Sequence, residues 1–377
     1  MREVVILGAG MHPFGRFSDK SYVDLGRTAA IEALRDAGVS WREIQSAYVG
    51  HCYQGMCAGH NVMAQLGYTG IPIYNMENAC ASGTGAVALA FDAVTSGRID
   101  IALALGMEKQ ERGLVPATNM PLWWRSQGMG EFPSAHAQDA QRYLYDSEAT
   151  VVHLAKVAAK NHRHAALCQY AHYQNWPNMT VEDVLESRMI SDPLTVMMMA
   201  PASDGAAAVV VCGKDVAHRY HNARPLTIAA SVLETGLYNK AAFPWAGPQF
   251  SEMKAAVDKA YNIAGIGPKD LDYLECVDGF AYAELVSYEA LGLCNEGEGA
   301  KIIDEGITEL RGKLPANTDG GYIARGNALG ATGLSGLVEV IRQLRGEASS
   351  RQVADAKVGL NMSGGAGPNI FVTILKK

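Results

Sequence analysis

The chain has 377 residues, of which 48% are hydrophobic and 19% are charged, and its formal net charge is −7. This composition is typical of a globular protein with a large core, and the acidic balance argues against nucleic-acid binding. No apolar run reaches the roughly 18 residues of a membrane span, and "MREVVILGAG" lacks the long apolar region of a signal peptide. We therefore expect a cytoplasmic enzyme with no membrane partner, whose seven cysteines are reduced.

Two pairs of stretches repeat each other across the chain. Residues 31–49 and 258–276 each predict a helix that ends at Ala-Gly, then a turn and a strand. The sequences "SGTG" (82–85) and "GATG" (330–333) each open a helix that leads to another strand. This duplication predicts an α/β fold in which two βαβ-rich halves with mainly parallel sheets stack in five layers, αβαβα.

The halves have unequal lengths because one of them carries an insertion. We predict an N-terminal half at 1–221, which includes an inserted loop domain at about 116–195 and closes with the strand "GAAAVVVC". The C-terminal half is predicted at 222–377.

The stretch "ENACASGTGA" (77–86) places Cys80 between a short predicted strand and the start of a helix. Unpaired N–H groups at a helix start favour the thiolate, which is the nucleophilic form. Small neighbours also leave room for a substrate carbonyl and free backbone donors for an oxyanion. Cys80 is therefore a candidate nucleophile, and the alternative is a buried structural cysteine.

No metal site or permanently bound cofactor is expected. Cys52 and Cys57 are the closest pair of cysteines, but no second pair and no histidine cluster stand at zinc-site spacing from them.

Five blocks of the sequence, taken together, resemble the thiolase superfamily. They are "NACASGTGA", "KNHRHAALCQYAHYQ" (160–174), "SDPLTVMMMAPASDGAAAVVV" (191–211), "NTDGGYIARGNALGATG" (317–333) and "NMSGGAGP" (361–368). The second and third blocks are similar to the sterol-carrier-protein type of thiolase. The resemblance implies the thiolase fold, with two duplicated βαβαβαββ halves. It further implies acyl-CoA as substrate, coenzyme A as co-substrate and a homodimer. It also implies a small partner subunit with a zinc ribbon and an OB fold that binds acyl-CoA.

The resemblance places the catalytic loops but also shows where the chain departs from the family. The nucleophile falls on Cys80, and the two loop histidines of the family fall on Val277 and Asn327. No second cysteine stands at the usual places, and all ten histidines lie at or before His221. An amide cannot accept a proton, so Asn327 is expected to act as an oxyanion donor. The backbone of Gly364 and Gly365 is expected to supply the second oxyanion hole.

The departures leave the acid or base of the reaction unassigned. Asp278 is carried as a catalytic candidate, although the resemblance gives its position mainly a loop-ordering role. The remaining candidates flank the catalytic loops or lie in the insertion, and the sequence does not choose among them: Tyr322, Tyr282, Cys276, His136 and His153.

The insertion carries the predicted substrate contacts. The indole of Trp124 and the guanidinium of Arg125 suit an aromatic group and a carboxylate, or else form an anchor with a surface arginine. Lys160 and His162, with two further basic neighbours, can meet the phosphates of coenzyme A, or else form a solvated helix face.

These observations favour a CoA-dependent thiolase that cleaves a 3-oxoacyl-CoA. The resemblance and the Trp124–Arg125 pair suggest an aromatic, carboxylated acyl group of the benzoylsuccinyl-CoA type. The alternative is a thiolase-fold retro-aldolase or a non-catalytic subunit of an acyl-CoA-processing complex. Acylation of Cys80 by an acyl-CoA would separate the first reading from the other two.

Overall fold

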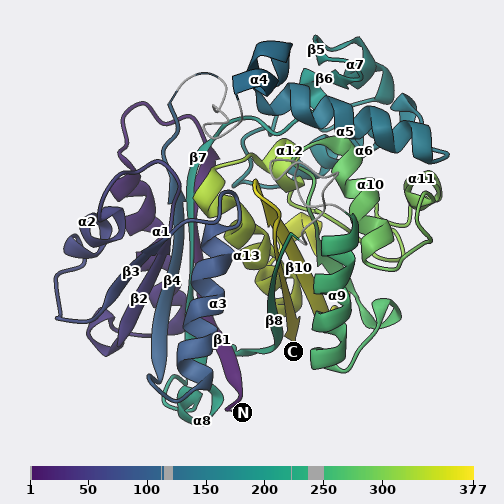
Figure 1. Cartoon of the computed structure of the whole chain (residues 1–377). Coiled ribbons are helices and arrows are strands. Elements are labelled where there is room, and N and C mark those ends of the chain that lie inside the picture. The colour runs from purple at the N-terminus through teal and green to yellow at the C-terminus, as the bar shows by residue number, and fades with distance from the viewer. Residues whose placement is uncertain (1, 112, 114–121, 222, 237–249) are drawn as a thin grey trace.

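A computed structural model describes residues 2–111, 113, 122–221, 223–236 and 250–377 (Figure 1). The first half is built from these elements: β1 (Val4–Gly15), α1 (Tyr22–Ala37), β2 (Ser46–Gly50), α2 (Ala58–Ala64), β3 (Ile73–Met76), α3 (Ser82–Thr95), β4 (Ile101–Glu108), β7 (Asp204–Gly213) and α8 (Lys214–Ala217). The second half is built from these: β8 (Leu226–Thr235), α9 (Phe250–Ala264), β9 (Tyr273–Glu275), α10 (Ala281–Ala290), α11 (Gly299–Asp304), α12 (Gly321–Arg325), α13 (Thr332–Arg345), β10 (Val358–Gly365) and β11 (Asn369–Lys376).

The predicted duplication is visible in the strand order. In the first half the strands lie in the order β3-β2-β4-β7-β1, and in the second half β9-β10-β11-β8 repeats it from the second strand on. The counterpart of β3 is reduced to one bridge between Leu274 and Ala316. Helices α1 and α9 also end alike, because Gly38 and Gly265 both take a left-handed conformation, with φ of 66° and 65°.

The expectation of mainly parallel sheets is wrong. Among the strands that the structure describes, the β2–β3, β2–β4 and β9–β10 pairs are parallel. The β4–β7, β1–β7, β1–β8, β8–β11 and β10–β11 pairs are antiparallel. The physical reason is the connection: a short turn joins β10 to β11, and such turns produce antiparallel neighbours. The edges of the two sheets also meet, where β1 and β8 pair over only two residue pairs.

The five predicted layers are confirmed by the packing of the helices. Helix α1 packs on β1 and β7, and α3 packs on the other face of the same sheet. Helix α13 contacts α3 and covers β10 and β9, while α9 covers the outer face of the second sheet (Figure 1). The layer between the sheets is rich in alanine, valine and leucine, which allows α3 and α13 to approach closely. The nucleophile turn and the Asn327 loop therefore meet where these two helices begin.

The inserted segment covers the end of the molecule at which α12 lies (Figure 1). Residues 116–121, the start of the predicted loop domain, lie outside the described residues. Helix α6 packs on α10, α11 and α12, and so ties the insertion to the second half. The elements of the insertion are α4 (Leu122–Trp124), α5 (Phe132–Asp146), α6 (Val151–Ala165), α7 (Val181–Glu186), β5 (Met189–Ser191) and β6 (Leu194–Thr195).

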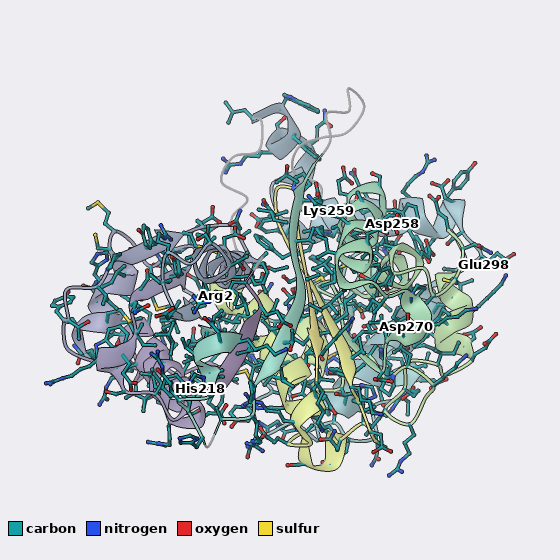
Figure 2. All side chains as sticks on the ribbon, turned by 90° about the horizontal axis from the view of Figure 1, so that it is seen from below. Arg2, His218, Asp258, Lys259, Asp270 and Glu298 are labelled. Atoms are coloured by element: carbon teal, nitrogen blue, oxygen red, sulfur yellow. The ribbon has the colours of Figure 1, made fainter. Side chains whose placement is uncertain are left out.

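Charged side chains lie mostly on the outside, as Asp258, Lys259 and Asp270 do around the second half (Figure 2). Within the part of the chain that is described, no helix combines the length and the apolarity needed to cross a bilayer.

Candidate active site

Cys80 occupies a tight turn between β3 and α3. Ala79, just before it, takes a left-handed conformation with φ of 51°, and the Gly85 N–H donates to the Ala81 carbonyl as the helix begins. The Ser82 hydroxyl closes the turn, since it accepts from the Asn78 N–H at 2.8 Å and donates to the Ala79 carbonyl at 2.7 Å. Cys80 is partly exposed. The turn therefore presents the thiol next to a helix start, where the sequence placed it.

The resting state of this thiol differs from the expectation. Burial raises the pKa of Cys80 to about 11, and the Asn327 side chain opposes this rise only in part. The helix start therefore does not make Cys80 a thiolate at neutral pH, because the loss of water around the sulfur outweighs it. A thiol with this pKa needs a proton acceptor when it reacts.

Asn327 meets Cys80 from the opposite half of the molecule. Its Nδ2 lies 3.6 Å from the Cys80 Sγ. Its Oδ1 accepts from the Leu329 N–H at 3.0 Å and from the Thr332 hydroxyl at 2.8 Å. These two donors fix the orientation of the amide, so that its N–H₂ end faces the sulfur. The geometry therefore suits a hydrogen-bond donor and offers no base.

The end of β10 lies against the nucleophile turn. A Cβ at Gly365 would stand 2.3 Å from the Asn78 carbonyl oxygen and 3.2 Å from the Ala79 side chain, so only glycine fits there. Gly364 and Gly365 are the last residues of β10, paired with Ile370 and Asn369, and do not belong to the turn that follows. Both glycines thus lie near Cys80, as the oxyanion-hole prediction requires.

Asp278 is buried below α12 with both carboxylate oxygens engaged. Its Oδ1 accepts from the Tyr322 N–H at 2.6 Å, and its Oδ2 accepts from the Ile323 N–H at 3.2 Å and from Asn161 Nδ2 at 2.8 Å. Burial, followed by the neighbouring charge of Glu284, raises its pKa to about 8. These contacts describe an anchor for α12, in agreement with the loop-ordering role that the sequence also allowed.

The prediction that Lys160 and His162 meet phosphates is wrong. Both side chains are completely buried. The Lys160 ammonium pairs with the Glu284 carboxylate and lies 3.1 Å from the Tyr288 hydroxyl. Burial lowers the pKa of His162 to about 4, and its Nε2 lies 3.3 Å from the Met197 carbonyl. The residues face inward because α6 packs against α10 and α12, so neither the phosphate site nor the solvated helix face describes them.

Trp123 and Trp124 of the insertion both belong to α4. The rings of Trp123 and Trp124 stack with centroids 6.2 Å apart, and Arg125 is exposed at the start of the next turn. The exposed guanidinium is available to a ligand carboxylate. Substrate recognition by Trp124 and Arg125 stays a prediction.

The other acid or base candidates are engaged elsewhere. His136 Nδ1 lies 2.8 Å from the Tyr282 hydroxyl, its ring stacks on Phe280, and burial lowers its pKa to about 4. His153 caps α6 and contacts Asp304 at 3.2 Å. Cys276 is buried on the strand side of the loop. None of these side chains makes a described contact with Cys80.

Two histidines near the site were missed by the sequence analysis. His51 is buried, and neither ring nitrogen has a hydrogen-bond partner among the described residues. Its Cα would lie 2.6 Å from a Cβ at Gly330, in the loop before α13. His172 Nδ1 shares a hydrogen bond of 2.8 Å with the Ser203 hydroxyl. A Cβ at Gly326 would lie 3.2 Å from the His172 Cβ. A signal did exist for His51, since it follows β2 directly, and ligands gather at the carboxyl ends of parallel strands.

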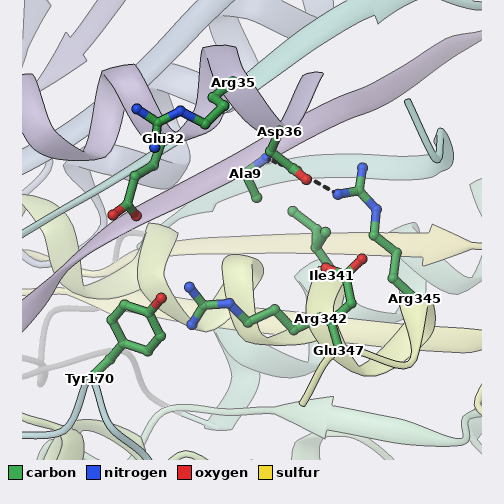
Figure 3. A pocket seen from close by; sticks show the side chains of 9 residues that line it. All are labelled: Ala9, Glu32, Arg35, Asp36, Tyr170, Ile341, Arg342, Arg345 and Glu347. Atoms are coloured by element: carbon green, nitrogen blue, oxygen red, sulfur yellow. Dashed lines mark hydrogen bonds and ion pairs between the residues drawn. The ribbon is translucent and has the colours of Figure 1, made fainter. Parts of the chain in front are cut away.

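A cavity lies away from Cys80, between α1 and α13 (Figure 3). Arg345 pairs with Asp36 there at 2.7 Å, and the Arg342 guanidinium lies 4.0 Å from the centre of the Tyr170 ring. Both arginines end α13, whereas Cys80 contacts its start through the Gly333 N–H. Nine helical residues separate the two places, about 14 Å. The cavity is therefore distinct from the nucleophile site.

The fold and the site together define a class of enzymes with a cysteine between two stacked α/β halves, and comparison with known families agrees. Residues 4–215 match the family described as "Thiolase, N-terminal domain", and residues 239–377 match "Thiolase C-terminal domain-like". The chain belongs to the thiolase family and is an acyltransferase.

Among curated proteins, the chain is 35% identical to "Acetyl-CoA acetyltransferase" of Methanothermobacter thermautotrophicus, over the full length of both chains. It is 34% identical to "Benzoylsuccinyl-CoA thiolase subunit BbsB" of Thauera aromatica, over 93% of this chain and 91% of that protein. It is 33% identical to human "Sterol carrier protein 2", over 100% of this chain and 72% of that protein.

Solved structures share the fold. The "Ltp2-ChsH2(DUF35) aldolase" superposes with a TM-score of 0.85 at 24% identity, covering 98% of this chain and 97% of that chain. Human mitochondrial 3-ketoacyl-CoA thiolase superposes with a TM-score of 0.74 at 18% identity, covering 100% and 99%. Because thiolases and an aldolase share this architecture, the fold by itself does not select the reaction.

Proposed function

We propose that this protein is a CoA-dependent thiolase that cleaves a 3-oxoacyl-CoA through an acyl-enzyme on Cys80. The observation that carries the proposal is the fixed approach of Asn327 Nδ2 to the Cys80 sulfur, at 3.6 Å. The sulfur attacks the 3-oxo carbonyl, the bond between the α- and β-carbons breaks, and coenzyme A then takes the acyl group from Cys80. The Asn327 amide and the backbone N–H groups at Gly364 and Gly365 hold the oxyanions of the two steps.

We propose an aromatic, carboxylated acyl group for the substrate. Trp124 and the exposed Arg125 offer an aromatic surface and a guanidinium. The rings of His136 and Phe280 stack 4.0 Å apart beside the Asp278 loop and add a second aromatic surface. The likeness to a benzoylsuccinyl-CoA thiolase subunit agrees with this choice.

We also propose a homodimer that works in the cytoplasm with a small acyl-CoA-binding subunit. Strand β3 forms the outer edge of the first sheet, and Tyr74 on it is 42% exposed, as an edge that pairs with a second copy would be. The relative BbsB is named as a subunit, and the similar aldolase is a complex with a DUF35 protein. Light scattering that gives a 40 kDa monomer would contradict the dimer. Full thiolase activity of this chain alone would contradict the need for the second subunit.

A retro-aldolase is the second candidate, favoured by the superposition on the Ltp2-ChsH2 aldolase. Mass spectrometry after mixing with an acyl-CoA separates the two. A thiolase gains one acyl group, which peptide mapping places on Cys80. An aldolase or a non-catalytic subunit gains none, and that result would withdraw the thiolase proposal.

A further inference from the structure

The main-chain groups of Asn327 are held by the first half of the molecule. Its N–H donates to the Pro201 carbonyl at 3.0 Å, and its carbonyl accepts from the Ser203 N–H at 2.9 Å. The same carbonyl accepts a second hydrogen bond, from Gln110 Nε2 at 2.5 Å. Asn327 belongs to the second half, so these three bonds join it to the half that carries Cys80.

Gln110 stands two residues after the end of β4, and its own main chain is fixed. Its N–H donates to Asp204 Oδ1 at 3.0 Å, and its carbonyl accepts from the Arg16 guanidinium at 3.0 Å. Asp204, the first residue of β7, is 2% exposed and also pairs with Lys109 at 3.0 Å. The glutamine side chain therefore starts from a backbone that the ends of β4 and β7 hold in place.

The hydrogen bonds of the Gln110 amide determine which way it points. Nε2 donates to the Asn327 carbonyl and, at 2.9 Å, to the Ser203 carbonyl, so both of its hydrogens are used. Turned over, the amide would set its oxygen against two carbonyl oxygens. In the observed orientation Oε1 is buried and has no hydrogen-bond partner among the described residues. The side chain thus serves as a double donor, although its acceptor is left unpaired.

The bond from Gln110 acts on the residue that faces the nucleophile. Asn327 Nδ2 lies 3.6 Å from the Cys80 sulfur, and the carbonyl that Gln110 holds belongs to the same residue. The residue before Asn327 is also closely packed, since a Cβ at Gly326 would lie 2.4 Å from Ser203 Oγ. A shift of the Asn327 carbonyl would therefore move its amide relative to the sulfur.

We propose that Gln110 is a positioning residue that holds Asn327 at its working distance from Cys80, an inference that rests on the thiolase function proposed above. Gln110 makes no described contact with Cys80, so it acts through Asn327. Without its amide, the Asn327 carbonyl keeps the bond from the Ser203 N–H, so the loop loosens but stays in place. Misplacing a group of the active site by about 1 Å can lower a rate about 10²-fold.

The first test needs no substrate. Burial raises the pKa of Cys80 to about 11, and the hydrogen bond from the Asn327 amide lowers it. A loosened amide lowers it less, so labelling of Cys80 by iodoacetamide at fixed pH should slow about twofold to threefold in Gln110→Met, the effect of about half a pKa unit. Asn327→Ala should slow the labelling at least as much. Unchanged labelling in Gln110→Met would overturn the positioning role.

The second test is a double-mutant cycle with acetoacetyl-CoA and coenzyme A as probes. Gln110→Met keeps the length of the side chain without its donors, and should lower kcat about 10–100-fold with little change in KM. Added to Asn327→Ala, it should lower kcat by less than about twofold more, because the group that it positions is already gone. Losses that multiply in full, or a parental kcat in Gln110→Met, would refute the positioning role.

The matched control is Gln352→Met, beyond the far end of α13. Gln352 Nε2 also donates to two carbonyls, those of Gln343 and Val353, both at 2.8 Å. The control loses the same two bonds and should keep the parental kcat and the parental labelling of Cys80. Equal losses in Gln352→Met and Gln110→Met would show a general loss of stability and overturn the proposal.

A second variant retains the shape of the side chain. In Gln110→Glu a protonated carboxyl can donate one hydrogen bond and an ionised one can donate none, so kcat relative to the parent should fall as the pH rises through the pKa of the introduced group. A ratio that does not change with pH would contradict the donor role. A parent that gains no acyl group on Cys80 from an acyl-CoA would refute the thiolase function, whereas the labelling test would still decide the positioning of Asn327.

Discussion

The two halves start their inner helices at equivalent places but surround those starts with different chemistry. Before α3, residues 78–82 carry no charge and Ser82 closes the turn through two hydrogen bonds, while the Glu77 carboxylate accepts from the Ala79 N–H at 2.6 Å. Before α13, the loop rests on buried ions: Arg325 pairs with Asp319 at 2.5 Å and Glu275 at 3.3 Å, and donates to the Thr332 carbonyl.

This difference shows how a duplicated fold can divide one reaction. At the start of α3 close packing is reached with glycine, as at Gly83, where a Cβ would lie 2.7 Å from the Gly330 carbonyl oxygen. The charged half cannot shift without separating buried ions, so the loop that carries Asn327 is held in place. In the proposed reaction, one half supplies the reacting sulfur and the other supplies the amide that faces it.

The largest expected effect comes from removing the reacting atom. Cys80→Ala should abolish thiolysis, with a loss on the order of 10⁶-fold as for other covalent nucleophiles, while the melting temperature stays near that of the parent. Steady-state assays and calorimetry measure both quantities. The matched control is Cys57→Ala, which removes an exposed cysteine and should keep full activity. Full activity of Cys80→Ala would end the thiolase proposal.

The next largest effect is expected from substitutions of Asn327 in the opposite half. Asn327→Ala should lower kcat about 10²–10³-fold, since one oxyanion donor is lost. Asn327→Asp should be worse, because a carboxylate would repel the developing oxyanion. Asn327→His should introduce a titration in the pH–rate profile at roughly pH 6–7. If Asn327→Asp turned over like the parent, Asn327 would not face an oxyanion.

The stability of the two helix starts should differ as their chemistry does. Arg325→Met leaves two buried carboxylates without their partner and should destabilise the protein by about 3–5 kcal/mol. Ser82→Ala removes one closing hydroxyl from the neutral turn and should cost about 1–2 kcal/mol. Urea unfolding of both variants compares them directly, and an equal cost would remove the distinction between a charged and a neutral start.

The smallest expected effect is the dependence of Cys80 labelling on pH. Because burial raises the pKa of Cys80 to about 11, its thiolate fraction should rise about tenfold per pH unit through the neutral and alkaline range and level off near pH 11. Labelling by iodoacetamide, followed by mass spectrometry of the Cys80 peptide, measures this slope. A plateau below pH 8 would show that the helix start outweighs burial. After burial, the side chains that act on this sulfur are Asn327, which lowers its pKa, and Glu108 and Glu77, which raise it.

Local sequence patterns were sufficient to predict much of the fold. The Ala-Gly stops at 37–38 and 264–265 predicted two helix ends, because a left-handed C-terminal residue is a property of a few neighbouring residues. The same holds for the closing hydrogen bonds of the turn at Cys80, which join Asn78, Ala79 and Ser82. Strand direction was not local, since it depends on the length and path of each connection, and the sheets proved largely antiparallel.

The sequence by itself determined the duplication, the place of Cys80 and the absence of histidine from the second half. Residue identities and short-range periodicity are enough to establish these three features. Only the tertiary structure decided how deeply each side chain is buried and in which direction neighbouring strands run. The presence of a basic residue in a helix does not indicate which side of that helix faces the core. Lys160 was therefore predicted to contact a phosphate, although it pairs with Glu284 in the interior. The meeting of Asn327 with Cys80, whose Nδ2 and Sγ lie 3.6 Å apart, likewise required both halves to be placed together, because 247 residues separate them along the chain.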